Sequence, residues 1–219
     1  MLPKHVDLSR QMLDNILYGR GITIYRHTNG PVIWYPSYIS ITDCSGYINA
    51  LLQQSYNLPI GWSGSIRPYA STYYRLINNQ TRFDKFGKFD SINNINNVQI
   101  GDLIVFKNLH RTPQNDNTGH IMIVNSLPIS VNSMDPIDPI QPIIPNTYQW
   151  IIQIIDQSSA HGTNDTRYNG KYNNGLGRGY FRIYVDGGGK YMGYTWSSEK
   201  ISKYINHTDR PIVIGRFIN

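Results

Sequence analysis

The chain has very little cysteine: Cys44 is the only one in 219 residues. This excludes an intrachain disulfide framework and any zinc site built on several cysteines. Long apolar runs are also missing, since no stretch approaches the roughly 18 apolar residues of a membrane-spanning helix. The N-terminal MLPKHVDLSRQ has no apolar segment after its basic residues, so we expect no signal peptide. Together these absences predict a soluble protein that is cytoplasmic or delivered by a non-signal route.

Runs of like charge are absent as well. The chain carries 20 Lys and Arg against 14 Asp and Glu, for a formal net charge of +6. The basic residues are scattered singly, without the clusters typical of nucleic-acid or polybasic membrane patches. We therefore expect a solvated basic surface and no nucleic-acid partner. Oligomeric state is left open.

The apolar patterns change from helical to strand-like along the chain. Helical spacing predicts one helix from about Val6 to Tyr18, a second after Asp43 that ends before Pro59, and a weaker third over 69–77. Apolar strands follow at 103–106, 121–124, 148–156, 180–186, 191–197 and 210–218, with 180–186 and 191–197 forming a hairpin. Helices followed by sequential strands predict an α+β domain over 1–219, with the helices packed on a small antiparallel sheet or partial barrel.

The remaining segments are predicted to be irregular. A short apolar stretch occupies 22–25, the aromatic and proline-punctuated 31–41 is expected to lack regular structure, and the Asn-rich 78–97 is expected to be loop. Five prolines fall between Ser126 and Tyr148. Proline breaks helices and central strands, so we predict a surface insertion at about 127–147.

The lone cysteine lies in TDCSGYINALL, residues 42–52, at the predicted start of the second helix. Thr42 or Asp43 can cap that helix, which places Cys44 in its first turn. The free N–H groups and partial positive charge of a helix N-terminus stabilise a thiolate, and the same N–H groups can hold an oxyanion. Cys44 is therefore a candidate nucleophile. The alternative is a small buried residue at a helix–sheet contact.

A cysteine nucleophile needs a base, and His120 at the head of the strand 121–124 is the strongest candidate. Asp156, at the end of the next strand, can orient the imidazole if the two strands are neighbours. The competing interpretation is a strand-end histidine and a turn aspartate without catalytic roles.

In their order along the chain, these residues resemble the NlpC/P60 family of papain-like cysteine peptidases and amidases. DCSGYINALL, at 43–52, is similar to the family's D-C-S-G-[FY] nucleophile motif. GDLIVF at 101–106 and GHIMIV at 119–124 resemble the two strands that precede and carry the base. QWIIQIIDQSS at 149–159 stands where the third polar residue is expected. The blocks cover roughly residues 40–160, apart from the proline-rich insertion.

The resemblance implies a papain-like core and hydrolysis of amide bonds, usually in peptidoglycan stem peptides, without a metal or organic cofactor. It implies that Cys44 is the nucleophile and His120 the general base and acid. Asp43 and Ser45 would help to hold a substrate amine. The third catalytic residue departs from the family's usual His, Asn or Gln: Asp156 is our choice, and Gln157, Ser158 and His161 remain possible.

Two rival functions remain open at this point. The same thioester chemistry can serve acyl transfer or deconjugation. Alternatively, the 17 Tyr and 4 Trp can form a sugar- or peptide-binding face without catalysis. Within the loop SAHGTNDTR, His161, Asp165 and Arg167 can line a substrate cleft or lock the loop through an Asp–Arg pair, and we favour the lock.

Overall fold

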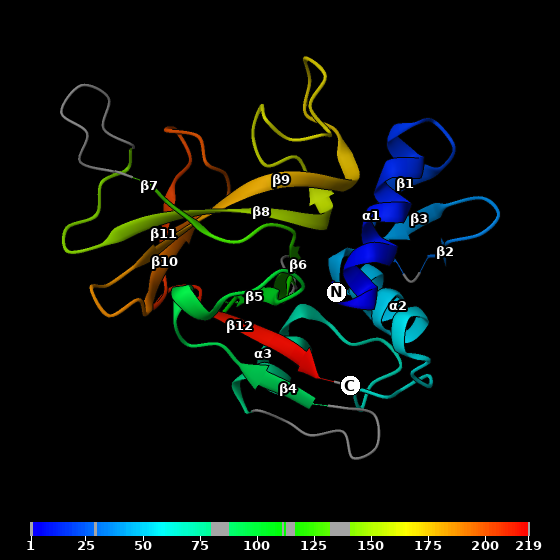
Figure 1. Cartoon of the computed structure of the whole chain (residues 1–219), viewed down its shortest axis with the longest axis horizontal. Helices are drawn as coiled ribbons and strands as arrows, with labels where there is room; N and C mark the ends of the chain where they lie inside the picture. The colour runs from blue at the N-terminus through cyan, green and yellow to red at the C-terminus, as the bar shows by residue number, and fades with distance from the viewer. Residues whose placement is uncertain are drawn as a thin grey trace.

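The computed structural model describes residues 2–28, 30–79, 88–110, 112, 117–131 and 141–218. It is a mixed α+β structure in which three helices and a short 3₁₀ turn accompany twelve strands in this described part (Figure 1). The helices are α1 (Lys4–Leu17), α2 (Cys44–Tyr56) and α3 (Ala70–Asn78), and the 3₁₀ turn is η2 (Ile95–Asn97). The strands are β1 (Ile22–Tyr25), β2 (Val32–Ile33), β3 (Ile39–Thr42), β4 (Lys88–Ser91), β5 (Leu103–Lys107), β6 (Gly119–Val124), β7 (Ile129–Val131), β8 (Tyr148–Ser159), β9 (Asn174–Val185), β10 (Tyr191–Thr195), β11 (Tyr204–Asn206) and β12 (Ile212–Ile218).

The main sheet is antiparallel throughout its described pairs. Its order is β11-β10-β9-β8-β6-β5-β12-β4, and β7 pairs with β8 beside this path. β8 and β9 form the longest ladder, from the pair Tyr148–Val185 to the pair Ser159–Asn174. The hairpin predicted at 180–197 is confirmed by the pairing of β9 with β10. The sequence of helices followed by an antiparallel sheet thus matches the predicted α+β class.

The sheet curls so that strands far apart in its order face one another. Phe106 on β5 and Tyr194 on β10 stack with their ring centroids 5.0 Å apart. Three strands separate β5 from β10 in the sheet, a distance of about 19 Å if the sheet were flat. The curled face encloses a second apolar core formed by alternate residues of the strands, among them Ile104, Met122, Ile154 and Phe181.

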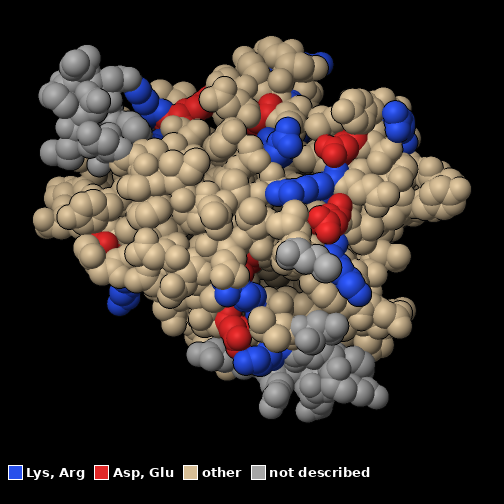
Figure 2. Space-filling model, in the orientation of Figure 1, with Lys and Arg blue, Asp and Glu red and all other residues tan. Residues whose placement is uncertain are grey.

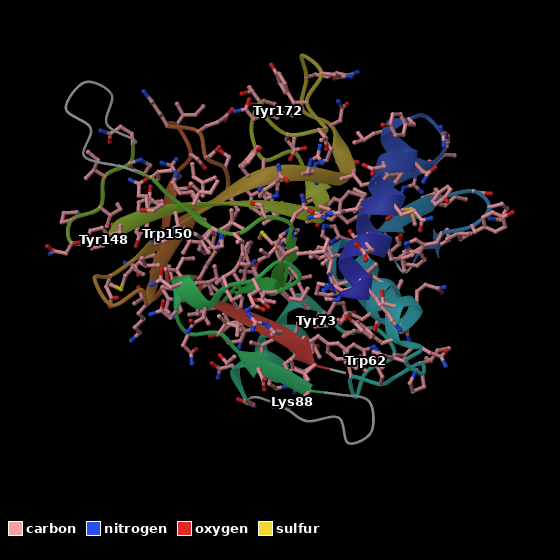
Figure 3. The ribbon with its side chains drawn as sticks, in the orientation of Figure 1. Trp62, Tyr73, Lys88, Tyr148, Trp150 and Tyr172 are labelled. Atoms are coloured by element: carbon pink, nitrogen blue, oxygen red, sulfur yellow. The ribbon has the colours of Figure 1, made fainter. Side chains whose placement is uncertain are left out.

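The helices cover the opposite face of the central strands. Leu103, Val105, Ile121 and Ile123 point to this side and join one core with helix residues, because strand side chains alternate between faces. The helical contribution comes from Tyr47, Ile48, Leu51, Leu52, Tyr73, Leu76 and Ile77, each no more than 4% exposed. Trp62 and Tyr73, labelled in Figure 3, pack with ring centroids 6.5 Å apart in the same layer. Most of the buried aromatic rings therefore belong to one of the two apolar cores.

A small separate sheet leads the chain into α2. β3 pairs in parallel with β1 and antiparallel with β2. The prediction that 31–41 lacks regular structure is therefore wrong for residues 32–33 in β2 and 39–41 in β3. Each of these strands has only two to four residues, so no alternating pattern is long enough to be recognised.

The expectation of a loop over 78–97 is also wrong in part. Residues 88–91 form β4, which pairs with β12 through Phe89 and Phe217. The polar composition of this segment hides a strand whose partner lies over 100 residues away. Residues 80–87 lie outside the described part of the chain.

The proline-rich segment is described only in part, and it contains one short strand. Residues 129–131 form β7, beside β8 and off the main path of the sheet, and residues 141–147 run as turns into β8. The middle of the predicted insertion, 132–140, lies outside the described residues.

The surface carries its charges in small mixed groups. On the face shown in Figure 2, acidic and basic side chains alternate without a broad field of one sign. In the described part of the chain, no helix is both long and apolar enough to cross a membrane.

Candidate active site

Cys44 is the first residue of α2, immediately after the small sheet. Its neighbour Asp43 caps the helix, because its Oδ1 accepts a hydrogen bond from the N–H of Gly46 at 2.7 Å. A side chain at Gly46 would place a Cβ 2.2 Å from Oγ1 of Thr42, so the turn requires glycine. The first four N–H groups of a helix have no carbonyl partner within it, and that of Cys44 is one of them. The predicted position of the thiol at a helix N-terminus is confirmed.

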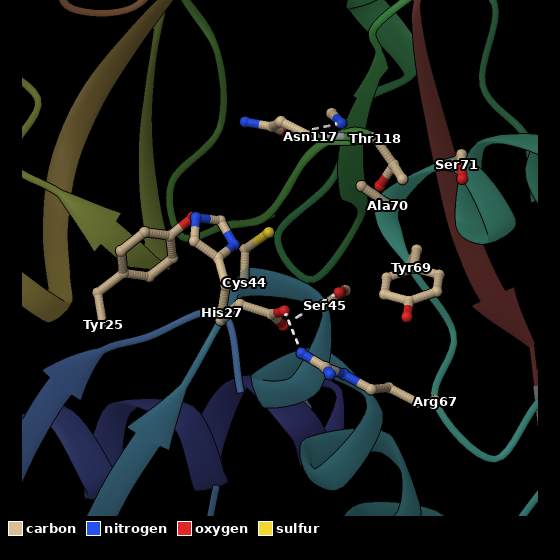
Figure 4. A pocket seen from close by; sticks show the side chains of 12 residues that line it. Tyr25, His27, Cys44, Ser45, Arg67, Tyr69, Ala70, Ser71, Asn117 and Thr118 are labelled. Carbon is tan, nitrogen blue, oxygen red and sulfur yellow. Dashed lines mark hydrogen bonds and ion pairs between the residues drawn. The ribbon is translucent and has the colours of Figure 1, made fainter. Parts of the chain in front are cut away.

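A cleft of about 280 Å³ opens over Cys44. Figure 4 shows the thiol among polar and aromatic side chains from the small sheet, α2, the segment before α3 and the start of β6. Its described lining consists of Tyr25, His27, Asp43, Cys44, Ser45, Arg67, Tyr69, Ala70, Ser71, Asn117, Thr118 and Gly119. Cys44 is 6% exposed, and its residual exposure is to the cleft. The thiol is therefore largely shielded from bulk water.

His120 reaches this region from the second position of β6. The preceding Gly119 has φ +132°, and a Cβ there would lie 2.0 Å from the carbonyl oxygen of Phe106. Glycine thus allows the strand to pass close to β5 directly before the histidine. The ring of Trp196 lies 5.0 Å from that of His120, and the imidazole is buried.

The two nitrogens of His120 have different neighbours. Nε2 bonds Oδ2 of Asp156 at 2.5 Å, which leaves Nδ1 for the side chain of Cys44. Burial alone would lower the pKa of His120, but a negative charge on Cys44 and hydrogen bonds with Asp156 and Cys44 raise that pKa to about 9. The arrangement favours the protonated form of the His120 ring.

Asp156 is completely buried on β8, the strand next to β6. Its Oδ2 also bonds Nε2 of His161 at 2.9 Å, and its Oδ1 forms an ion pair with Arg167 at 2.9 Å. Burial by itself would raise the pKa of Asp156, but Arg167 and the two histidines hold it well below the usual value. Asp156 therefore stays ionised behind His120.

Arg167 anchors this carboxylate from the loop between β8 and β9. Its guanidinium also pairs with Asp165, with Nε 2.8 Å from Oδ1 and Nη2 2.6 Å from Oδ2. Nη1 donates to Oγ of Ser158 and to the carbonyl of Gly175. The predicted Asp165–Arg167 pair is present. Arg167 also pairs with Asp156, and this second pair was not predicted from the sequence.

His161 supports Asp156 from the other side. Its Nδ1 lies 2.5 Å from the carbonyl oxygen of Trp196, and its ring stacks on that indole at 3.9 Å between centroids. Both ring nitrogens thus face oxygen acceptors. Both nitrogens are therefore occupied within this network, and His161 supports Asp156 rather than contacting the thiol through them.

Gln157 and Ser158, which the sequence also allowed as the third catalytic residue, have different partners. Gln157 bonds Ser40 and the carbonyl of Ile24 in the small sheet. Ser158 bonds Arg167. In the described structure, Asp156 is the one of the four candidates that bonds His120.

His120, Asp156 and His161 are also the one described group with metal-ligand chemistry. Their ligand atoms lie within 4.8 Å of one another. However, each histidine directs its Nε2 at the same carboxylate oxygen, and Arg167 occupies the other oxygen. A cation there would have to displace these N–H donors and tolerate the guanidinium, so the donor set fits a hydrogen-bond network better than a metal.

Asp43 and Ser45 lie at the cleft, next to the thiol. Oγ of Ser45 donates to Oδ1 of Asp43 at 3.1 Å, and Nη2 of Arg67 pairs with Oδ2 of the same aspartate at 2.9 Å. The carboxylate thus has donors on both oxygens.

Sequence reasoning missed Tyr25, Arg67 and Trp196. Tyr25 lines the cleft, and burial together with the charges of Cys44 and Asp43 raises its pKa, so its hydroxyl keeps its proton and can donate. No local motif marks these residues. They come from strand β1, the loop before α3 and the position directly after β10, which meet only in the folded chain.

Comparison with known proteins gives one informative relative. The chain is 41% identical over 225 residues to the "Uncharacterized protein R653" of Acanthamoeba polyphaga mimivirus, with 98% of this chain and 96% of that protein covered. This chain belongs to the family of that mimivirus protein. No family model matches the sequence. No solved structure gives a significant match. The relative extends over nearly the whole chain, so the helices, the curled sheet and the cleft are expected in both proteins.

Proposed function

We propose that this protein is a cysteine hydrolase that cleaves amide bonds. The observation that carries the proposal is the series of contacts from Cys44, which lines the cleft at a helix N-terminus, to the buried His120 and from there to Asp156. The resemblance to NlpC/P60 enzymes points to peptidoglycan stem peptides as the substrate.

The geometry supports a separate role for each of Cys44, His120 and Asp156 in a two-step reaction. The thiolate of Cys44 attacks the amide carbon, and the first-turn N–H groups of α2 stabilise the oxyanion. The imidazolium of His120 gives its proton to the leaving amine. The neutral imidazole then removes a proton from water, which attacks the thioester and releases the acid. Asp156 fixes the ring orientation and favours its charged form throughout.

A muropeptide digest analysed by mass spectrometry tests this function. Purified peptidoglycan fragments are incubated with the wild type, Cys44→Ala and His120→Gln. We expect new fragments that carry a free amine and a free carboxylate from the wild type alone. Unchanged fragments with the wild type, or equal cleavage by Cys44→Ala, would exclude the proposed reaction.

Acyl transfer is the second candidate, because the same thioester can react with an amine instead of water. Adding a primary amine to the digest separates the two. An amide adduct as the main product indicates transfer, whereas free acid at unchanged yield indicates hydrolysis.

A non-catalytic binding role finds less support in the described structure. Several large aromatic side chains are exposed, including Tyr148 at 60% and Tyr172 at 58%, but they lie in different regions (Figure 3). Retention on murein sacculi by Cys44→Ala, without any product from the wild type, would favour binding over catalysis.

A further inference from the structure

The charges beside Cys44 indicate which substrate groups the cleft accepts. An ammonium group on a substrate needs an uncompensated carboxylate. Among the described lining residues, Asp43 is the acidic one. Its Oδ1 already accepts from the N–H of Gly46 and from Ser45, and its Oδ2 is paired with Arg67. The one acceptor site left on Oδ2 lies beside the guanidinium of Arg67, whose positive charge repels a substrate ammonium group.

Arg67 is equipped to bind an acceptor. A guanidinium has five N–H donors, and in Arg67 one nitrogen, Nη2, bonds Asp43. The buried Nε has no hydrogen-bond partner in the described structure. The side chain is 27% exposed and lines the cleft. Its guanidinium carbon Cζ lies 5.6 Å from the ring centroid of Tyr69. Figure 4 shows the guanidinium directed at the start of α2, where a dashed line marks its ion pair with Asp43.

We propose that Arg67 makes this cleft select substrates with a carboxylate next to the scissile amide, rather than substrates with a free amine at that place. This inference rests on the proposed function and assigns its substrate class. It also changes the role of Asp43, which here holds Arg67 in place. A carboxylate is the natural partner, because it accepts two N–H bonds from the guanidinium fork.

Two alkylating reagents test the charge preference without any substrate. Iodoacetate and iodoacetamide share a leaving group and differ in bearing a carboxylate or a neutral amide. The ratio of their rates at Cys44, in native protein relative to denatured protein, measures the selectivity of the cleft. We expect native wild type to favour iodoacetate, and Arg67→Gln to lower the ratio about fivefold, since one charge is lost and Asp43 is left exposed.

Matched variants separate the local charge from the net charge. Asp43→Asn keeps a helix cap and removes one negative charge, so its ratio should rise above that of wild type. Arg20→Gln removes a positive charge from the turn after α1 and should leave the ratio unchanged. An Arg67→Gln ratio equal to that of wild type, or an equal drop in Arg20→Gln, overturns the proposal.

A binding measurement keeps the inference independent of thiol reactivity. N-acetyl-D-alanine and its amide are titrated into ¹⁵N-labelled Cys44→Ala and followed by NMR. We expect saturable shifts at the start of α2 with the acid only, and their loss in Cys44→Ala/Arg67→Gln. Equal shifts with acid and amide, or none with the acid, contradict the carboxylate site. A positive titration together with no peptidoglycan cleavage would disprove the hydrolase and keep the anion site.

Discussion

The protonation of His120 offers a quantitative prediction. Its pKa is raised from 6.5 to about 9 against the effect of burial, and the negative charge of Cys44 is the largest cause of the rise. At about 1.4 kcal/mol per pKa unit, the site favours the imidazolium by roughly 3 kcal/mol. Replacing Cys44 with alanine removes that charge and leaves the contact with Asp156. We therefore expect the pKa of His120 to fall by about one unit or more in Cys44→Ala.

The assay is a pH titration of the histidine ring signals by NMR between about pH 5 and 10, a range that brackets the ordinary and the raised pKa. The chain has six histidines, so the His120 signals are assigned by their disappearance in His120→Gln. Wild type should show one ring that titrates near pH 9. A titration near 6.5 in wild type, or the same midpoint in Cys44→Ala, would refute the thiolate–imidazolium pair.

The sign of the effect on stability follows from the same shift. The pKa of His120 is higher in the folded state than in the unfolded state. Its contribution to stability is therefore complete below about pH 6.5 and is lost as the pH rises through about 9.

Three further predictions concern the buried network. Arg167→Met should lower the free energy of unfolding in urea by about 3–5 kcal/mol because it leaves buried carboxylates uncompensated, whereas Lys171→Met at an exposed site of the same loop should change it by less than about 0.5 kcal/mol. Gly177→Ala would place a Cβ 2.3 Å from Nε of Arg167 and should cost about 1–3 kcal/mol, while Gly187→Ala, with no neighbour closer than 3.9 Å, should be tolerated. The pKa of Asp156 is lower in the folded than in the unfolded state. Its contribution to the free energy of unfolding is therefore present above about pH 4 and is lost as the pH falls through the pKa of the folded state. The free energy of unfolding should decline less between about pH 5 and 3 in Asp156→Asn than in wild type.

These predictions are contradicted by specific results. An Arg167→Met protein as stable as wild type would mean that the ion pairs contribute nothing net. Equal stabilities of Gly177→Ala and Gly187→Ala would show that Arg167 moves away at no cost. If the free energy of unfolding declined equally at acid pH in Asp156→Asn and wild type, other carboxylates would be responsible for acid unfolding.

Local patterns made much of the fold predictable. The helix at α2 follows from a cap, a first-turn glycine and apolar residues at helical spacing, all within residues 43–52. The strands β5 and β6 are mostly apolar over five and six residues, and the apolar residues of the longer β8 lie between Trp150 and Ile155. The short strands β2 and β3 were missed because two to four residues are too few for an alternating pattern to be recognised. The strand β4 was missed because its partner β12 lies over 100 residues away, and such pairing leaves little trace in a polar segment.

The site shows the same division between local and distant information. Cys44 and His120 stand out because a helix start and a strand head give each a recognisable setting. The neighbours of Asp156 do not stand out, since Arg167 and His161 come from a Gly- and Asn-rich loop that resembles a surface segment. Gly177 and Gly179 look like turn residues but lie in β9, where Arg167 and Asp165 occupy the space that side chains would fill.

The reactivity of Cys44 tests the central claim most directly. The rate constant for alkylation by iodoacetamide near neutral pH is measured by mass spectrometry for native wild type, native His120→Gln and denatured wild type. An activated thiolate predicts that native wild type reacts fastest, and that His120→Gln loses this advantage. A native thiol that reacts no faster than the denatured one, with no effect of His120→Gln, would contradict the account.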